Sequence, residues 1–421
     1  MNEIRDLIIG IDFGKENTQL CYYDRKADEP RSLSMKVGAN VYEAPTALCV
    51  RPGQTDFTVG IEAEYFAREK NGELIDNLYE VSGTEKPVQV LGESREPWEL
   101  AAGFIKGMLR YLGVMEIIRN TRCLCIATPE LTDVRVKNLK HACSSLGLPE
   151  DRFLLMDYGE SFYYYVMTQK KEIVNRSVAW FTFNGNAVTF RKLSVNNARK
   201  PVLVRLEEPV STDLPEPARE RDSAFCAFIQ KTLGTELFSS IQISGEGFDT
   251  DWAKQAVKLL CFQKRKVFYG NNLHAGGACA AGKERMEDRN LKNIRFLSES
   301  TVKHDVGMEM LVMGSPAYVP LITNGGNWYE CSSSCELILN KTEDLVFVVL
   351  AMGETEKKRV VMHLPGLPAR PDKTTRLLLE MAYVSPDRCR ITVTDLGFGD
   401  MFPSSGKVWK ETVNWTEEGV S

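Results

Sequence analysis

Two strand–turn–strand segments of the same form, far apart in the chain, place the strongest constraint on its fold. Residues 7–24 read L-I-I-G-I-D-F-G-K-E-N-T-Q-L-C-Y-Y-D, and residues 177–193 read S-V-A-W-F-T-F-N-G-N-A-V-T-F-R-K-L. In each, an apolar run breaks at a turn that contains glycine and then resumes, which is typical of a β-hairpin. The repetition predicts an internal duplication of one α/β unit.

The rest of the chain divides into a mixed part and a part rich in strands. Up to about residue 282, apolar runs alternate with stretches of helical spacing, and a third glycine turn, Gly245-Glu246-Gly247-Phe248, lies between an expected strand and an expected helix. After about residue 290, short apolar runs follow one another without helices, which indicates a β-sandwich. We therefore expect an α/β domain over residues 1–289, with halves of about 1–170 and 171–289, a sandwich over 290–400 and a C-terminal tail over 401–421.

Composition excludes several classes of partner. The net charge is −5, and the longest basic run is the short Lys357-Lys358-Arg359, which argues against nucleic-acid binding. The chain lacks an apolar run long enough to span a membrane, and its N-terminus lacks a signal-peptide pattern, so a cytoplasmic protein is expected. The 11 cysteines are scattered, and Cys331-x-x-x-Cys335 has no further ligand nearby, so neither a disulfide framework nor a metal site is expected.

The turn of the first hairpin has residues that could carry chemistry. Backbone N–H groups next to Gly14 could converge on a phosphate, and Asp12 stands where it could hold a hydrated cation such as Mg²⁺. The alternative is an ordinary hairpin in which the aspartate and the glycine serve only the turn.

The order of these features resembles the actin-like ATPase superfamily, and the expected sandwich narrows the resemblance to the DnaK-type, seventy-kilodalton heat-shock chaperones. Residues 9–14 (I-G-I-D-F-G) resemble the first phosphate loop of that family, and Gly245-Glu246-Gly247 its adenosine motif. The other matching stretches are residues 44–46 (A-P-T), 126–129 (I-A-T-P), Glu160, 319–322 (V-P-L-I), 363–369 (H-L-P-G-L-P-A) and 390–395 (R-I-T-V-T-D).

The resemblance implies a set of site residues. Asp12 and Glu160 would be the catalytic carboxylates, with Asp12 beside Mg²⁺. The residues implied to contact ATP or ADP are Asp12, Gly14, Lys15, Asn17, Gly185, Gly245, Gly247 and Phe248. Phe248 stands where the family has a stacking arginine and could stack on a base; the alternative is a core phenylalanine.

The sequence departs from that family where phosphoryl transfer needs charge. Thr182 and Ala187 stand where the family has the aspartate and threonine of its second phosphate loop, and Tyr79 stands where it has the catalytic lysine. Lys15-Glu16 replaces a threonine pair. Only 62 residues separate Thr182 from Gly245, too few for the extra lobe that the family inserts there. These departures predict a pseudo-ATPase.

Three hypotheses follow for function. The favoured one is a chaperone-like protein without a helical lid, in which residues 310–313 and 327–329 of the sandwich bind an extended protein or peptide client and no cofactor is needed; the alternative is that these residues are sandwich core. The second is an active ATP-dependent chaperone in which Asp12, Glu160, Gly185 and Gly245 position Mg²⁺ and ATP. The third is a sugar-kinase-type enzyme, against which the C-terminal strands count. The sequence leaves the client and the oligomeric state open.

Overall fold

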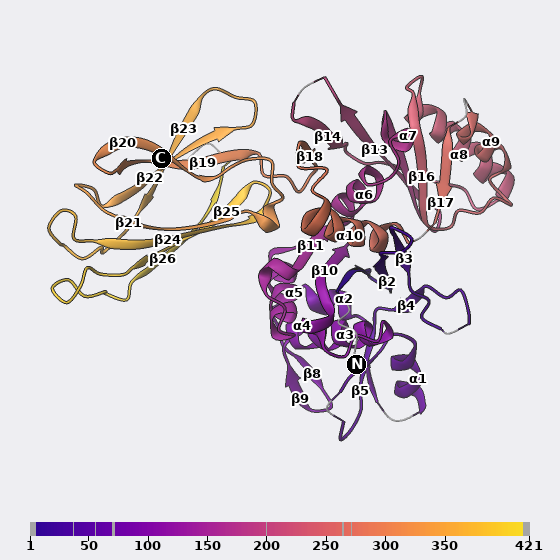
Figure 1. The fold of residues 1–421 in the computed structure, drawn as a ribbon, viewed down its shortest axis with the longest axis horizontal. Helices are drawn as coiled ribbons and strands as arrows, with labels where there is room; N and C mark the ends of the chain where they lie inside the picture. Colours follow the sequence, from indigo (N-terminus) through magenta and orange to yellow (C-terminus); the bar gives the residue numbers. More distant parts are fainter. Residues whose placement is uncertain are drawn as a thin grey trace. The chain divides into compact units, whose positions relative to one another are not determined.

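The computed structural model describes residues 6–415 except Val37, Thr55, Lys70, Asn71, Arg199, Gln263, Lys264 and Asn271. The chain divides into two compact units, Met1–Ser298 and Glu299–Ser421, coloured from indigo to orange and from orange to yellow in Figure 1. The expectation of a mixed α/β protein is confirmed, since unit 1 combines helices and sheets and unit 2 adds further sheets. None of the described helices combines the length and apolar character needed to cross a bilayer.

The first half of unit 1 is built on a sheet with the strand order β3–β2–β1–β10–β11. β1 pairs antiparallel with β2 and parallel with β10, so the opening hairpin lies at the centre of the sheet. β4 pairs with the turn end of β2. The bounds are β1 (Leu7–Phe13), β2 (Asn17–Asp24), β3 (Glu29–Ser32), β4 (Glu43–Pro45), β10 (Thr121–Thr128) and β11 (Phe153–Asp157).

Smaller elements fill the chain between β4 and β11. The start of α3 follows a local signal, because Glu96 and Glu99 form a capping box around Pro97 at its first turn. The elements are β5 (Leu48–Val50), β6 (Thr58–Val59), α1 (Ile61–Glu69), β7 (Glu73–Ile75), α2 (Leu78–Ser82), β8 (Val88–Val90), β9 (Glu93–Arg95), α3 (Pro97–Tyr111), α4 (Ile117–Asn120), α5 (Asp133–Ser145) and the 3-10 turn Glu150–Arg152.

The second half repeats the strand order and directions of the first. Its sheet runs β17–β16–β12–β13–β14–β18, in which β12 pairs antiparallel with β13 and parallel with β16. β15 pairs with the turn end of β13, as β4 does with β2. The bounds are α7 (Lys171–Val174), β12 (Ser177–Asn184), β13 (Ala187–Asn196), β14 (Val202–Leu206), β15 (Val210–Asp213), α8 (Ala218–Leu233), β16 (Phe238–Glu246), α9 (Lys254–Leu260), β17 (Lys266–Tyr269) and β18 (Ile294–Leu297).

The last helix of each half packs on the sheet of the other half. α6 (Tyr158–Met167) follows the first sheet, yet Phe162 on it stacks on Trp180 of β12, with ring centroids 4.4 Å apart. α10 (Leu273–Lys283) follows the second sheet and lies against β1, where a Cβ at Gly10 would collide with the carbonyl oxygen of Ala275. This exchange joins the two halves into one core.

Unit 2 consists of two four-stranded antiparallel sheets, with strand orders β20–β19–β22–β23 and β21–β24–β25–β26. In β25 the buried and half-buried residues alternate, as expected of a strand with one face on a core. The bounds are β19 (His304–Val312), β20 (Ser315–Ile322), the 3-10 turn Trp328–Glu330, β21 (Ser332–Ile338), β22 (Asp344–Ala351), β23 (Lys357–His363), β24 (Arg376–Ser385), β25 (Arg388–Asp395) and β26 (Val408–Asn414).

Two expected boundaries need correction. The first domain does not end at residue 289, because the helix continues through Glu284–Asp288 and leads into β18, which pairs with β14 of the same sheet. The first unit therefore ends at Ser298. The expected tail over 401–421 contains β26, which pairs with β25 along its whole length and places Trp409 and Trp415 in buried positions.

The backbone of α10 gives a test of the packing between the halves. Gly277 abuts the carbonyl oxygen of Ser161 in α6, whereas a Cβ at the neighbouring Gly276 would lie 3.5 Å from the ring of Tyr165, an ordinary contact. Both Gly→Ala changes gain helix propensity of up to about 1 kcal/mol. We expect Gly277→Ala to lower the free energy of unfolding by about 1–3 kcal/mol through overpacking and Gly276→Ala to leave it equal or higher. Urea unfolding of both variants checks this, and equal effects would contradict the close approach.

Candidate functional site

The hydroxyl of Tyr158 contacts two of the predicted site residues at the turn of the first hairpin. Asp12 is 6% exposed at the end of β1, and its Oδ1 accepts a hydrogen bond of 2.6 Å from the hydroxyl of Tyr158. Gly14 lies next to the same hydroxyl, since a Cβ there would be 3.3 Å from it. The structure thus brings Asp12 and Gly14 together. The phenol of Tyr158, the first residue of α6, contacts both of them.

The electrostatics of this site favour a neutral aspartic acid. Burial raises the pKa of Asp12 from 3.8 to about 7, the hydrogen bond from Tyr158 opposes the rise, and the charge of Glu43 adds to it. The ring of Tyr158 stacks on His274, with centroids 3.5 Å apart, and burial lowers the pKa of His274 to about 3. Ser161 Oγ lies 2.8 Å from His274 Nδ1. Between about pH 3 and about pH 7 the cluster is therefore a buried, uncharged network.

The other predicted residues of the first half have different neighbours. Glu160 is buried in the first turn of α6 and faces Arg285, with 3.7 Å between Glu160 Oε1 and the guanidinium. Lys15 is exposed, and its Nζ lies 5.9 Å from the ring centroid of Tyr79. Asn17 begins β2 and pairs with Pro45.

The second and third glycine turns are brought together around one arginine. Arg221 of α8 donates hydrogen bonds to the carbonyl oxygens of Gly185 (2.6 Å) and Gly247 (3.1 Å). Its guanidinium carbon lies 4.7 Å from the ring centroid of Trp252. The N–H of Gly185 donates to the carbonyl of Glu246. The carbonyl groups of these two turns therefore point to the guanidinium of Arg221. The spacing of the glycines did not predict this arrangement.

The side chain of Phe248 is part of the core of the second half. It is 6% exposed and packs among Phe183, Phe225, Trp252 and Tyr269. Gly245, with φ of 88°, abuts the carbonyl of Phe183 and thus serves the close approach of β16 to β12. The core alternative for Phe248 fits this packing better than a stacking role does.

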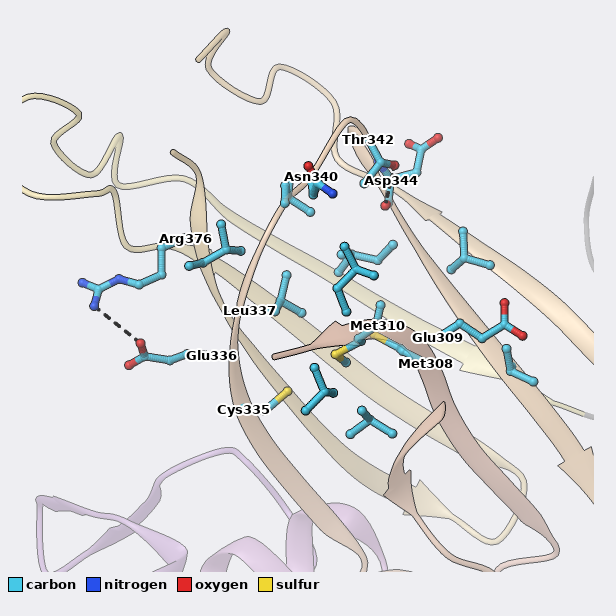
Figure 2. Close-up of a pocket in the computed structure, with 18 of the residues that line it drawn as sticks. Met308, Glu309, Met310, Cys335, Glu336, Leu337, Asn340, Thr342, Asp344 and Arg376 are labelled. Carbon is cyan, nitrogen blue, oxygen red and sulfur yellow. Dashed lines mark hydrogen bonds and ion pairs between the residues drawn. The ribbon is translucent and has the colours of Figure 1, made fainter. Parts of the chain in front are cut away.

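A groove of about 880 Å³ lies in unit 2, lined mostly by apolar side chains of β19, β21 and β22 (Figure 2). Met308 and Met310 enter it from β19, and Leu337 from β21. Leu311 and Val312 on its rim are 55% and 45% exposed. The expected client-binding residues 310–313 line this groove.

Residues 327–329, the second expected contact, lie elsewhere. Trp328 and Tyr329 are each 5% exposed and form a 3-10 turn, and neither lines the groove. They are core residues, the alternative that the sequence left open.

The groove coincides with a fork in the sheet. The pairing between β19 and β22 stops at Met308 and Phe347. Beyond that point β19 continues to Val312 paired with β20, and β22 extends back to Asp344 paired with β23. Residues 309–312 and 344–346 therefore form two arms, each paired on one side only among the described strands.

The open edges of the arms make the fork a template for another strand. Alternate residues of a strand direct their N–H and C=O groups to the same side, so each arm presents unpaired backbone groups toward the other. Thr342 Oγ1 satisfies the backbone of Asp344 at the end of one arm. The rest of the fork combines open main-chain hydrogen-bonding groups with the apolar side chains that line the groove, which form its floor. A peptide that adds to a sheet as an extra strand uses both.

Charges on the rim of the groove are paired with one another. Arg359 of β23 lies 2.9 Å from Glu309 of β19, and Arg376 lies 3.5 Å from Glu336 (dashed in Figure 2). His363 Nδ1 lies 2.9 Å from Asp344. The charges within the two arginine–glutamate pairs therefore cancel.

The burial of Asp12 predicts a pH dependence of stability. Its pKa is higher in the folded than in the unfolded state, so its contribution is favourable below about pH 4 and is lost as the pH rises to about 7. Asp12→Asn keeps the acceptor for Tyr158 without a charge. We expect the variant to gain stability over the natural protein by about 1.4 kcal/mol per pH unit across that range, up to about 4 kcal/mol.

Urea unfolding of both proteins at about pH 5 and about pH 8 measures this gap. The titration of His274 is common to both proteins and cancels in the difference. A gap that does not widen with pH would contradict a buried, neutral Asp12.

Comparison with known proteins places both units among uncharacterised families. Residues 29–299 match a family described as a family of unknown function (DUF5716), C-terminal, and residues 301–415 match a domain of unknown function (DUF8552). No curated protein matches the chain. Because the first match covers more than half of the sequence, the chain belongs to the DUF5716 family.

Proposed function

We propose that this protein is a passive, chaperone-like peptide-binding protein. Unit 2 holds an extended apolar segment of a client protein in the fork between β19 and β22, and unit 1 is an actin-like scaffold that does not turn over ATP. The fork carries the proposal, because two unpaired strand edges face each other across an apolar floor.

An inserted segment would add a strand between the two arms. Its backbone would pair on both sides, each hydrogen bond contributing about 0.5–1.5 kcal/mol, and alternate side chains would point to the floor formed by Met310 and Leu337. The paired charges of the rim favour an uncharged apolar segment over a charged one. Because the groove is open, the client would exchange freely, and moderate affinity is expected.

The repeated topology of unit 1 supports an actin-like scaffold. Both halves have the same five-strand order, with the same added strand at the hairpin turn, and their last helices are exchanged. In unit 2, Phe347 and Trp415 bring rings from the two sheets to 6.4 Å between centroids, in keeping with a sandwich. These features support the proposal that the protein resembles the heat-shock chaperones in architecture as well as in motifs.

Three features of unit 1 support a scaffold without nucleotide turnover. The N–H of Gly185 is used within the protein and its carbonyl faces Arg221, the reverse of what a phosphate requires. Tyr158 holds Asp12. Thr182 and Tyr79 supply neither the carboxylate nor the cation that phosphoryl transfer needs.

The state of the cysteines favours a cytoplasmic setting for the proposed activity. All 11 cysteines are free thiols, and most are buried. Free buried thiols suit a reducing compartment. We therefore place the activity in the cytoplasm.

Two valines that face each other across β22 and β23 test the fork. Val346 lines the groove and is 37% exposed, whereas its cross-strand partner Val361 is 45% exposed and does not line it. A carboxylate at the first position would lose its hydration when a client binds, and the nearby cation, Arg359, is already paired with Glu309. We expect Val346→Glu to weaken binding of a short fluorescein-labelled peptide of alternating valine and threonine at least about tenfold, and Val361→Glu to leave it unchanged.

Fluorescence anisotropy measures both affinities. A second peptide with N-methylated alternate amides cannot donate to one of the two arms and should bind more weakly than the first. Equal loss in both valine variants, or full binding of the methylated peptide, would overturn strand insertion in the fork.

A further inference from the structure

We propose that the fork in unit 2 takes the C-terminal end of a client chain rather than an internal segment. The client enters at the mouth of the fork, between Val312 and Asp344, runs antiparallel to β19 and ends beside Met308 and Phe347. This inference rests on the proposed function of the same groove.

The fork is closed at one end. From Met308–Phe347 back to His304–Ala351, β19 and β22 pair directly with each other, so no further strand fits between them in the sheet. A strand that is inserted between the two arms must therefore either stop at Met308 and Phe347 or leave the plane of the sheet there.

Both faces of the sheet are obstructed at this closed end. Met308 and Phe347 are 6% and 0% exposed, so the core blocks one face. On the other face, Arg359 of β23 reaches across β22 to Glu309 of β19, with 2.9 Å between Nη2 and Oε2. A client that ends at this point avoids both obstacles, whereas an internal segment meets one of them.

The direction of the client follows from the backbone that each arm offers. Pro316 has no N–H, so its pair with Leu311 is not hydrogen-bonded, and Leu311 directs its N–H and C=O toward the fork. On the shorter arm, both backbone groups of Asp344 bond to Thr342 Oγ1 (Figure 2). The client therefore aligns mainly with β19, and antiparallel pairing is the more stable choice. Because β19 runs from the closed end to the mouth, the client's C-terminus lies at the closed end.

Met313 marks the mouth of the fork. It stands at the turn between β19 and β20 with φ of 52°, where asparagine or glycine is usual. Its side chain lines the groove and is fully exposed. An apolar side chain at this position serves neither the turn nor the core, and it lies where the preceding residues of the client would pass.

Competition with three unlabelled peptides tests the direction and the chain end. Each contains the same segment of alternating valine and threonine, acetylated and amidated so that its ends carry no charge. Four prolines precede the segment in the first peptide, follow it in the second and flank it on both sides in the third. Prolines form a stiff chain without N–H groups, so they can neither pair in the fork nor turn sharply out of it.

The readout is displacement of the fluorescein-labelled valine–threonine peptide, labelled at its N-terminus, from the full chain. We expect the first peptide to bind at least about threefold more tightly than the second and at least about tenfold more tightly than the third. If the third competes as well as the first, the fork admits internal segments, and this inference fails while peptide binding stands. If the second competes as well as the first, the direction is wrong, and the inference fails too. If the labelled peptide does not bind at all, the proposed function fails with it.

A variant at the mouth tests the path of entry. Met313→Asn suits the turn and removes the apolar side chain, and Met115→Asn makes the same change at an exposed position of unit 1. We expect Met313→Asn to weaken binding of the first peptide at least about threefold and Met115→Asn to leave it unchanged. Equal affinity of both variants would contradict entry past Met313.

Discussion

The close approach of α10 to β1 and α6 is the constraint on which unit 1 depends. The run of glycine and alanine in α10 lets its backbone approach other backbone closely. Gly10 of β1 abuts Ala275, and Gly277 abuts Ser161 of α6. Larger side chains at these points would separate the two sheets. Because each half lends its last helix to the other, one hydrophobic cluster is shared by both halves, and the halves should unfold together.

The same helix contact shapes the chemistry of the central hairpin. α6 brings Tyr158 onto Asp12, and α10 brings His274 onto the ring of Tyr158. The site at the first hairpin turn is thus occupied by Tyr158 and His274, side chains of the protein itself. Arg221 likewise occupies the second and third glycine turns. Unit 2 differs, since its fork leaves backbone groups and apolar side chains open. This contrast is why we assign binding of the client to unit 2.

The sequence predicted the features that depend on local pattern. The hairpins at Gly14 and Gly185, the mixed first unit and the strand-rich second one follow from turn residues and apolar spacing. Residues 310–313 were expected to contact a client, and the structure shows that they line a groove. The fork could not be predicted, because it depends on where pairing between β19 and β22 stops, at Met308 and Phe347. Arg221 lies 26 residues from Gly247, and only the fold brings them together. β26 was missed because its residues alternate weakly in polarity.

A thermal-shift titration with a valine–threonine peptide and, separately, with Mg²⁺-ATP tests the central claim most directly. A ligand of the folded protein raises its melting temperature by mass action, adding about 2.7 kcal/mol at a hundredfold excess over the dissociation constant. Our account predicts a rise with the peptide and none with ATP at millimolar concentration. A rise with ATP that is lost in Asp12→Ala, together with no rise from the peptide, would contradict it and restore an active nucleotide site in unit 1.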